Sequence, residues 1–133
     1  MRVSVIIPRR NEAKPIGRVL ADVPADLVNE VIVVDNQSSD GATDIAARMG
    51  ALVVSEARRG YGQACLTGLE APDVVVFLDG DYSDRPAELP LLRAPLAEGR
   101  ADITIGSRIA GPTHVRSASL ACAFWKLASG KLN

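Results

Sequence analysis

The chain has 133 residues, of which 47% are apolar and 23% are charged. This is the composition of one ordinary globular domain, and it excludes a disordered tail, a collagen-like repeat and a disulfide-stapled miniprotein. Fifteen basic and sixteen acidic residues give a formal charge of -1, which argues against a nucleic-acid partner bound through bulk basicity.

Five short apolar runs rich in β-branched residues alternate with segments of helical spacing. Continuous apolar runs are typical of strands that are buried on both faces of a parallel sheet. The predicted strands are Val3–Ile7, Val31–Val34, Leu52–Val54, Val74–Leu78 and Ile103–Ile105. The predicted helices lie between Ile16 and Val23, between Asp40 and Gly50, from Gly62 to Leu69, and from Pro86 to Leu96. This order predicts an α/β fold, a Rossmann-like and mostly parallel sheet with helices on both faces.

The polar residues that follow the predicted strands form the candidate site. In a sheet of this kind, ligands bind beyond the carboxyl ends of the strands. The segments at that edge are Pro8–Glu12, Asp35–Gly41, Arg58–Gly62, Asp79–Asp84 and Gly106–Arg108. The amino ends of the strands look bland by comparison, so the asymmetry predicts a site at the carboxyl edge.

The most informative pair at this edge is Asp79 and Asp81. Two carboxylates two residues apart at a strand end point the same way and repel each other unless a cation lies between them. Hard oxygen ligands suit Mg²⁺ or Mn²⁺, and such an ion can bridge a diphosphate and neutralise the charge of a leaving group. The alternative is an acidic turn that caps the following helix, with Gly80 supplying backbone freedom. The motif alone leaves both interpretations open.

The other candidate residues also have two interpretations each. Asp35 can bind a ribose or simply end its strand, and Glu12 can line the site or serve as a first-turn helix acid. Gly60 opens a helix whose backbone N–H groups can receive a phosphate or a base edge, although the pattern around it is not the dinucleotide fingerprint. Arg58 and Arg59 can pair with a diphosphate or remain solvated surface charges.

Taken together, these segments resemble the family 2 glycosyltransferases of the GT-A fold, most nearly the polyprenyl- or dolichyl-phosphate sugar synthases. The matching segments occur in the order and spacing of that family, and they cover residues 3 to 111. They are Val5–Pro8 with Asn11–Glu12, Glu30–Asn36 through Ser39–Gly41, Arg59–Gly62, Val75–Asp81, Pro86–Leu89 and Ile105–Arg108.

The resemblance implies a nucleotide pocket at the first three strand ends. Its implied lining residues are Pro8, Glu12 and Asp35, with Asp35 near the base or the ribose. Arg58 or Arg59, together with Gly60, is implied to flank the nucleotide and its diphosphate. The donor implied is a nucleotide sugar, a UDP- or GDP-hexose.

The resemblance also implies the reaction and its catalytic residues. Asp79 and Asp81 would hold Mg²⁺ or Mn²⁺ on the donor diphosphate, and Arg108 would bind phosphate, including that of the acceptor. Asp81 and Arg108 are the implied catalytic residues. The hexosyl group is transferred with inversion at the anomeric carbon. If the acceptor is a polyprenyl phosphate, it is already anionic at neutral pH, and a strong general base is less necessary.

The chain departs from the family pattern at three positions near the first two strand ends. Arg9 and Arg10 stand where small, apolar or aromatic residues are usual, and Gln37 stands where glycine is usual. Each departure can crowd or recharge the nucleotide pocket.

The C-terminal residues match the family poorly. Residues 1–111 are predicted to form the GT-A donor-binding domain, and residues 112–133 a tail with a short amphipathic helix. Leu120, Phe124 and Leu127 share one face of that helix, with Trp125 and Lys126 near its end. Such a helix lies at a membrane interface or packs on the sheet. Family members normally continue well past this point, so we expect a C-terminally truncated relative.

Two functions of different classes follow from these observations. The first is a metal-dependent glycosyltransferase, and the alternative is a truncated, non-catalytic nucleotide-sugar-binding module. A nucleotidyltransferase ranks below both, because the glycine- and arginine-rich loop expected after the first strand is absent. The first apolar run is too short for a signal peptide, and no apolar stretch reaches the ~18 residues of a membrane span. We therefore expect a cytoplasmic protein that can contact the inner face of the membrane, with a partner chain or homo-oligomer as a possible source of the acceptor site.

Overall fold

The computed structural model describes residues 2–9, 13–37, 39, 41–58, 72–80, 85–106 and 121–126. The strands are β1 (Val3–Arg9), β2 (Glu30–Asp35), β3 (Leu52–Ser55), β4 (Val74–Phe77), β5 (Ile103–Gly106) and β6 (Ala121–Lys126). The helices are α1 (Ala13–Asp22), α2 (Ala42–Arg48) and α4 (Leu89–Ala97), with the 3-10 turn η1 (Pro86–Glu88) before α4. All five predicted strands are present, and three of the four predicted helices are found in place. The fourth, predicted over residues 62–69, lies outside the described residues.

The strands form one six-stranded sheet in the order β3-β2-β1-β4-β6-β5. β1 pairs in parallel with both β2 and β4, and β2 pairs in parallel with β3. β6 is antiparallel to its two neighbours, β4 and β5. The strand order reverses at β1, since β2 and β3 lie on one side of it and β4 on the other. The carboxyl ends of β1 and β4 are therefore the switch point, the place at which open α/β sheets bind ligands.

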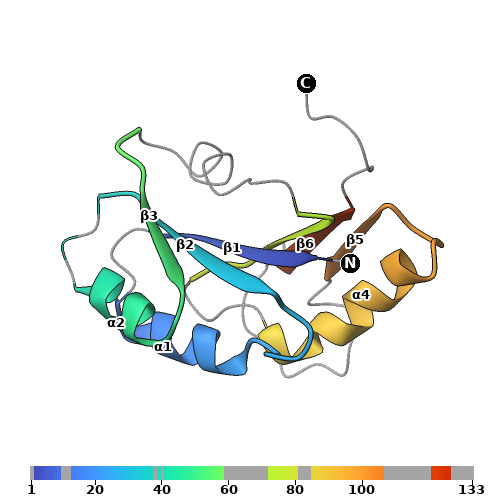
Figure 1. The fold of residues 1–133 in the computed structure, drawn as a ribbon, viewed down its shortest axis with the longest axis horizontal. Coiled ribbons are helices and arrows are strands. Elements are labelled where there is room, and N and C mark those ends of the chain that lie inside the picture. The colour runs from blue at the N-terminus through green and yellow to red at the C-terminus, as the bar shows by residue number, and fades with distance from the viewer. Residues whose placement is uncertain are drawn as a thin grey trace.

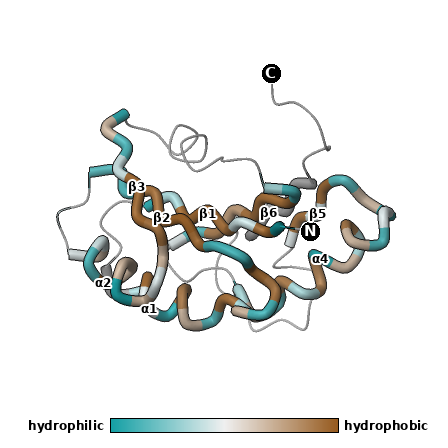
Figure 2. Tube along the Cα trace, in the orientation of Figure 1, coloured by the Kyte–Doolittle hydropathy of each residue, from teal (hydrophilic) through white to brown (hydrophobic). Residues whose placement is uncertain are grey.

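Both faces of the sheet are apolar, as the continuous runs predicted. Figure 1 shows α1, α2 and α4 on the same side of the sheet. The strand residues buried against that layer are Val3, Val5, Ile7, Val33, Val74, Val76 and Leu78. The strand residues buried on the opposite face are Ile6, Ile32, Val34 and Val75. Figure 2 shows hydrophobic residues concentrated along the central strands, whereas the helices carry both hydrophobic and hydrophilic residues.

Local sequence explains where α2 begins and ends. Gly41 precedes the helix with φ 75°, and Gly50 follows it with φ 86°. Both values lie in the left-handed region, which glycine adopts at little cost. Asp44 lies in the first turn, where a negative charge interacts favourably with the helix dipole. The helix expected between Asp40 and Gly50 is confirmed.

The helix predicted in the C-terminal tail is wrong over residues 121–126, where the chain forms β6. Val76 pairs with Phe124, and Thr104 pairs with Phe124 from the other side. The segment thus fills the space between two strands and supplies hydrogen-bonding partners to both. Such pairing outweighs a helical spacing that extends over only about two turns, because a short isolated helix is marginal in water.

Candidate functional site

The pairing of β1 with β4 ends at Pro8, at the switch point of the sheet. The last registered pair is Ile6 with Phe77, and the N–H of Leu78 donates to the carbonyl of Ile6 at 3.0 Å. Groups two residues apart in a strand point to the same side, so the next donor on this side of β1 belongs to Pro8. Proline has no N–H, and the ladder stops there. Pro8 is buried at this point, and its role in lining a nucleotide pocket stays a prediction.

Two oppositely charged residues are buried side by side at the carboxyl ends of β1 and β2. Arg9 is 3% exposed and Asp35 is 7% exposed, and the two are register partners on adjacent strands. Charged groups are rarely buried without a compensating charge nearby. The unusual arginine at position 9 therefore places a cation beside Asp35, the residue expected to contact the base or ribose.

The chain segments that follow β2 and β3 are joined by the buried side chain of Asn36. Its Nδ2 donates to the carbonyl of Glu56 at 3.1 Å and to the carbonyl of Arg58 at 2.6 Å. Its backbone N–H donates to the carbonyl of Arg9 at 3.0 Å. The backbone N–H of Glu56 in turn donates to the carbonyl of Asp35 at 2.9 Å. Three neighbouring strand ends are thereby held together through one amide side chain and two backbone bonds.

The turn after β2 is bent by a residue in a conformation that favours glycine. Gln37 has φ 59°, the only non-glycine residue with a positive φ in the part of the chain that the structure describes. A side chain in the left-handed region carries a steric cost of order 1 kcal/mol. Gln37 is exposed at this point, so the departure from the usual glycine strains the turn rather than filling the core.

Arg58 forms an ion pair with Glu56 in the segment after β3. Nε donates to Oε1 of Glu56 at 3.0 Å and Nη2 donates to Oε2 at 2.9 Å, a two-pronged contact. The backbone N–H of Arg58 also donates to Oε1, at 2.8 Å. The Glu56 side chain is 6% exposed, whereas that of Arg58 is 69% exposed. The hydrogen bonds and the negative charge of Glu56 raise the pKa of Arg58 above its ordinary value, so the guanidinium stays charged.

Asp79 follows β4, one residue beyond Leu78, and is half-buried. A carboxylate in this place fits an oxygen-ligated Mg²⁺ or Mn²⁺. Within the described ranges, no group of three or more histidine, cysteine, aspartate or glutamate side chains is close enough to hold a metal ion. Asp81, the predicted companion of Asp79, lies outside the described ranges. Four other predicted site residues also lie outside them, namely Glu12, Arg59, Gly60 and Arg108.

The sequence pattern did not single out Glu56 or Asn36 as site residues. A signal for Glu56 exists in retrospect, because an acidic residue stands at or just after the end of each of β2, β3 and β4: Asp35, Glu56 and Asp79. A carboxylate that recurs at the same edge of neighbouring parallel strands is more informative than a single one. Asn36 gave no comparable signal, since asparagine after a strand is common in turns.

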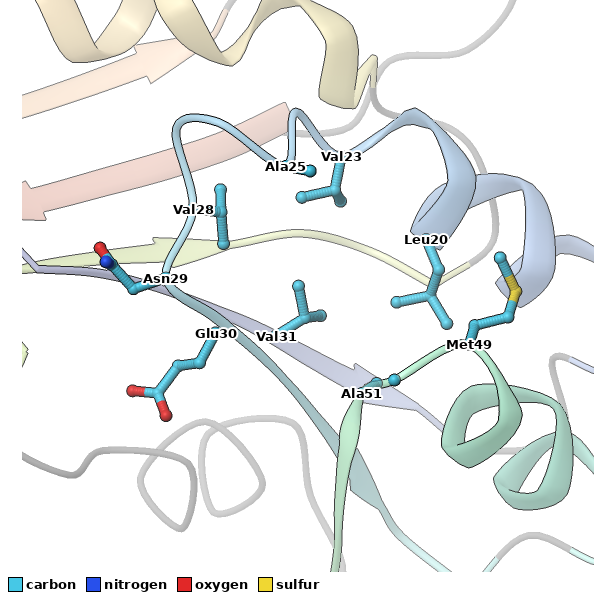
Figure 3. Close-up of a pocket in the computed structure, with 10 residues that line it drawn as sticks. Leu20, Val23, Ala25, Val28, Asn29, Glu30, Val31, Met49 and Ala51 are labelled. Atoms are coloured by element: carbon cyan, nitrogen blue, oxygen red, sulfur yellow. The ribbon is translucent and has the colours of Figure 1, made fainter.

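A separate pocket of about 230 Å³ lies at the amino edge of the sheet, between the ends of α1 and α2. Figure 3 shows Leu20, Val23, Val28 and Val31 pointing toward the same space, with the carboxylate of Glu30 to one side. None of the predicted site residues lines this pocket. Among the helices of the described residues, none is long and apolar enough to cross a membrane.

Comparison with known proteins gives a match over most of the chain. Residues 4–129 match the sequence model of Glycosyl transferase family 2. An uncharacterized glycosyltransferase of Mycobacterium tuberculosis is 42% identical over 108 residues, which are 80% of this chain and 48% of that protein. A dolichyl-phosphate hexose transferase of Haloferax volcanii is 37% identical over 111 residues, again 80% of this chain and 48% of the relative. The chain thus spans about half the length of these relatives.

Solved structures match the fold as well. Glucosyl-3-phosphoglycerate synthase from M. tuberculosis, in complex with uridine diphosphate, superposes with a TM-score of 0.68 and 32% sequence identity. The match covers 77% of this chain and 42% of the synthase. Other structures of the same synthase contain Mn²⁺ with UDP-glucose and phosphoglyceric acid, or Mg²⁺ with uridine diphosphate.

Proposed function

This chain belongs to Glycosyl transferase family 2, and from that premise we propose that it transfers a hexosyl group from a nucleotide-diphosphate sugar to an acceptor. The observation that carries the proposal is the placement of Asp35 and Asp79 at neighbouring carboxyl ends around β1. One carboxylate lies on the β2 side of the switch point, and the other on the β4 side. A nucleotide and its diphosphate laid across these strand ends would meet both.

The nucleotide pocket is proposed to be lined by Pro8, Glu12 and Asp35. Asp35 accepts hydrogen bonds from the base or the ribose, and the buried Arg9 is its register partner on the neighbouring strand. Arg58 or Arg59, together with Gly60, is proposed to flank the nucleotide and its diphosphate. Since the synthase of similar fold binds uridine diphosphate, a UDP-sugar is the first donor to test and a GDP-sugar the second.

A divalent cation is proposed to be held by Asp79 and Asp81. The described member of the pair fits such an ion because its carboxylate is half-buried at the switch point and supplies hard oxygen donors. When bound, Mg²⁺ or Mn²⁺ neutralises the negative charge of a departing diphosphate. The presence of both ions in structures of the similar synthase supports this choice of metal.

The acceptor is proposed to be a polyprenyl phosphate, with Arg108 binding its phosphate. The support is the Haloferax relative, whose name specifies hexose transfer to dolichyl phosphate. A phosphate oxygen that is already anionic attacks the anomeric carbon with inversion, the bond to the diphosphate breaks, and no base needs to remove a proton. A lipid acceptor requires contact with a membrane surface, so we propose peripheral association at its inner face.

The test is transfer of radiolabelled sugar. Purified chain is incubated with Mn²⁺, polyprenyl phosphate and either UDP-[¹⁴C]glucose or GDP-[¹⁴C]mannose, and label is counted in the organic phase. We expect label in the lipid with one donor, and none after chelation with EDTA. Nucleotide binding without product in lipid or water would instead support the second candidate, a nucleotide-sugar-binding module.

A further inference from the structure

The ion pair between Glu56 and Arg58 presents a fixed guanidinium at the carboxyl edge. The Glu56 carboxylate receives three hydrogen bonds from Arg58, one from its backbone and two from its side chain. Asn36 holds the same segment from the other side, through the carbonyls of Glu56 and Arg58. Arg58 therefore combines an exposed side chain with an anchored position, which a solvated surface arginine does not have.

The charge of this pair argues against a diphosphate ligand for Arg58. The positive charge of a guanidinium in two-pronged contact with a carboxylate is balanced by the negative charge of that carboxylate. An approaching diphosphate would therefore be repelled by Glu56 as well as attracted by Arg58. What the pair still offers is a planar group with an accessible surface, since 69% of the Arg58 side chain is exposed. Guanidinium planes pack well against aromatic rings. A nucleobase fits these properties better than a phosphate does.

The position of Arg58 in the sheet points the same way. Arg58 follows β3, and Asp79 follows β4, with β2 and β1 between them. Three strand spacings separate the two ends, roughly 14 Å at about 4.8 Å per spacing. If the diphosphate lies near Asp79, as in the proposed function, then the part of the nucleotide that reaches toward β3 is the nucleoside.

We propose that Arg58 packs against the nucleobase of the donor, and that Glu56 and Asn36 are positioning residues that hold it there. The inference rests on the proposed function, because it takes a nucleotide sugar as the ligand. It narrows the expected partner of Arg58 from the nucleotide and its diphosphate to the base, and it gives Glu56 and Asn36, which had no predicted role of their own, a role in donor binding.

The test is calorimetric binding of three probes to the full chain: UDP with Mn²⁺, UMP, and inorganic pyrophosphate with Mn²⁺. Arg58→Gln should lower the affinity for UDP and for UMP by the same factor, about tenfold for the loss of a stacked group. The affinity for pyrophosphate should not change. Arg58→Lys should not restore affinity, because an ammonium keeps the charge but not the plane. Glu56→Gln should weaken UDP and UMP to a similar degree, and the double variant should be no weaker than Arg58→Gln alone.

The matched control is Glu98→Gln. Glu98 also pairs with an arginine two residues away, Arg100, but on the exposed surface after α4, and its loss should change none of the three affinities. Thermal unfolding of each variant accompanies the titrations. Because the Arg58 side chain is exposed, its substitution should not unfold the chain. The Arg58 variants therefore test the base contact even if Glu56→Gln lowers stability.

Two outcomes overturn the inference while leaving the proposed function standing. One is that the wild-type chain binds UDP and UMP, and the Arg58→Gln variant binds both as tightly as the wild type does. The other is a loss for UDP and pyrophosphate that Arg58→Lys restores, which would return Arg58 to the diphosphate. A wild-type chain that binds no nucleotide with Mn²⁺, neither UDP nor GDP, overturns the proposed function together with the inference.

Discussion

The two edges of the sheet both carry polar residues, but they use them differently. At the amino edge, the charged and amide side chains are exposed or half-buried, and they hold the starts of strands. Arg2 pairs with Glu30 at 2.9 Å, and the backbone N–H of Arg2 donates to Asp73 at 2.6 Å. The buried polar residue at this edge is an uncharged one, Ser4, whose hydroxyl donates to Glu30. At the carboxyl edge, charged and amide residues are themselves buried, as Asp35, Asn36 and Glu56 are each no more than 7% exposed.

The difference teaches that burial, rather than the mere presence of polar residues, distinguishes the candidate site. The amino edge is less bland than the sequence pattern indicated, because Asn29, Glu30 and Asp73 all accept hydrogen bonds there. Those bonds replace bonds to water at little cost. Burying charged groups costs stability unless they are compensated, so their retention at the carboxyl edge indicates a use other than folding. Matched pairs of residues at the ends of β4 and β2, and in the turn after β2, allow this distinction to be tested.

The largest effect is expected at the two ends of β4. Asp79→Asn should lower the rate of sugar transfer about a thousandfold at saturating donor, since a Lewis-acid metal contributes several kcal/mol to such a step. Asp73→Asn, at the start of the same strand, is the matched control and should leave the rate unchanged. The measurement is transfer of labelled sugar at several Mn²⁺ concentrations. Equal losses in both variants would contradict the assignment of the metal site to the carboxyl edge.

The two ends of β2 should differ in stability. Asp35→Asn leaves the buried Arg9 without the neighbouring carboxylate and should lower the free energy of unfolding by about 3 kcal/mol. Glu30→Gln at the other end removes a partly exposed ion pair and should cost less than about 1 kcal/mol. Urea denaturation followed by circular dichroism gives both values. The second substitution Arg9→Met should recover stability in the Asp35→Asn background, and a further loss there would count against the charge argument.

The two asparagines that flank β2 offer a comparison of smaller size. Asn36→Ala removes a buried amide that bridges two chain segments and should lower stability by about 2 kcal/mol. Asn29→Ala removes one acceptor for the backbone N–H of Val3 at an exposed residue and should cost about 1 kcal/mol or less. Urea denaturation again supplies the measurement. If the order of the two costs is reversed, the carboxyl edge is not the more constrained of the two.

The smallest effect is expected at the turn after β2. Gln37→Gly relieves the strain of a side chain at φ 59° and should raise stability by up to about 1 kcal/mol, reduced by the greater freedom of glycine in the unfolded chain. Gly41→Ala places a side chain at φ 75° and should lower stability by about 1 kcal/mol. Differential scanning calorimetry resolves both shifts. Destabilisation by Gln37→Gly would mean that the Gln37 side chain contributes a favourable interaction.

The strands, and the gathering of the described candidate residues at one edge of the sheet, were predictable because their signals are local. Runs such as Val31–Val34 and Val74–Leu78 are apolar throughout, since both faces of a central parallel strand are buried. Turn residues are also recognisable in the sequence, and Gly50 correctly predicts the end of α2. The acids at strand ends could be placed at one edge from the strand order alone. Parallel strands all end at the same edge, so no knowledge of contacts was needed.

The features that were missed depend on contacts between distant parts of the chain. Residues 121–126 form a strand because β4 and β5 flank them, and the periodicity of six residues cannot show this. The role of Glu56 depends on the side chain of Arg58 folding back onto it, and that of Asn36 on a segment about twenty residues further along. Neither arrangement leaves a periodic trace in the sequence.

The insertion of β6 between β4 and β5 fixes an order of events during synthesis. β5 leaves the ribosome before β6, yet among the strands of the described residues β6 is its only neighbour in the sheet. Until residues 121–126 follow, roughly a second or more later at ordinary translation rates, β5 has no strand to pair with. Ile103 and Ile105, still about half exposed in the finished fold, are then accessible on an unpaired strand. A nascent chain paused in this interval should therefore bind chaperones that recognise short apolar segments, and should release them once β6 has emerged.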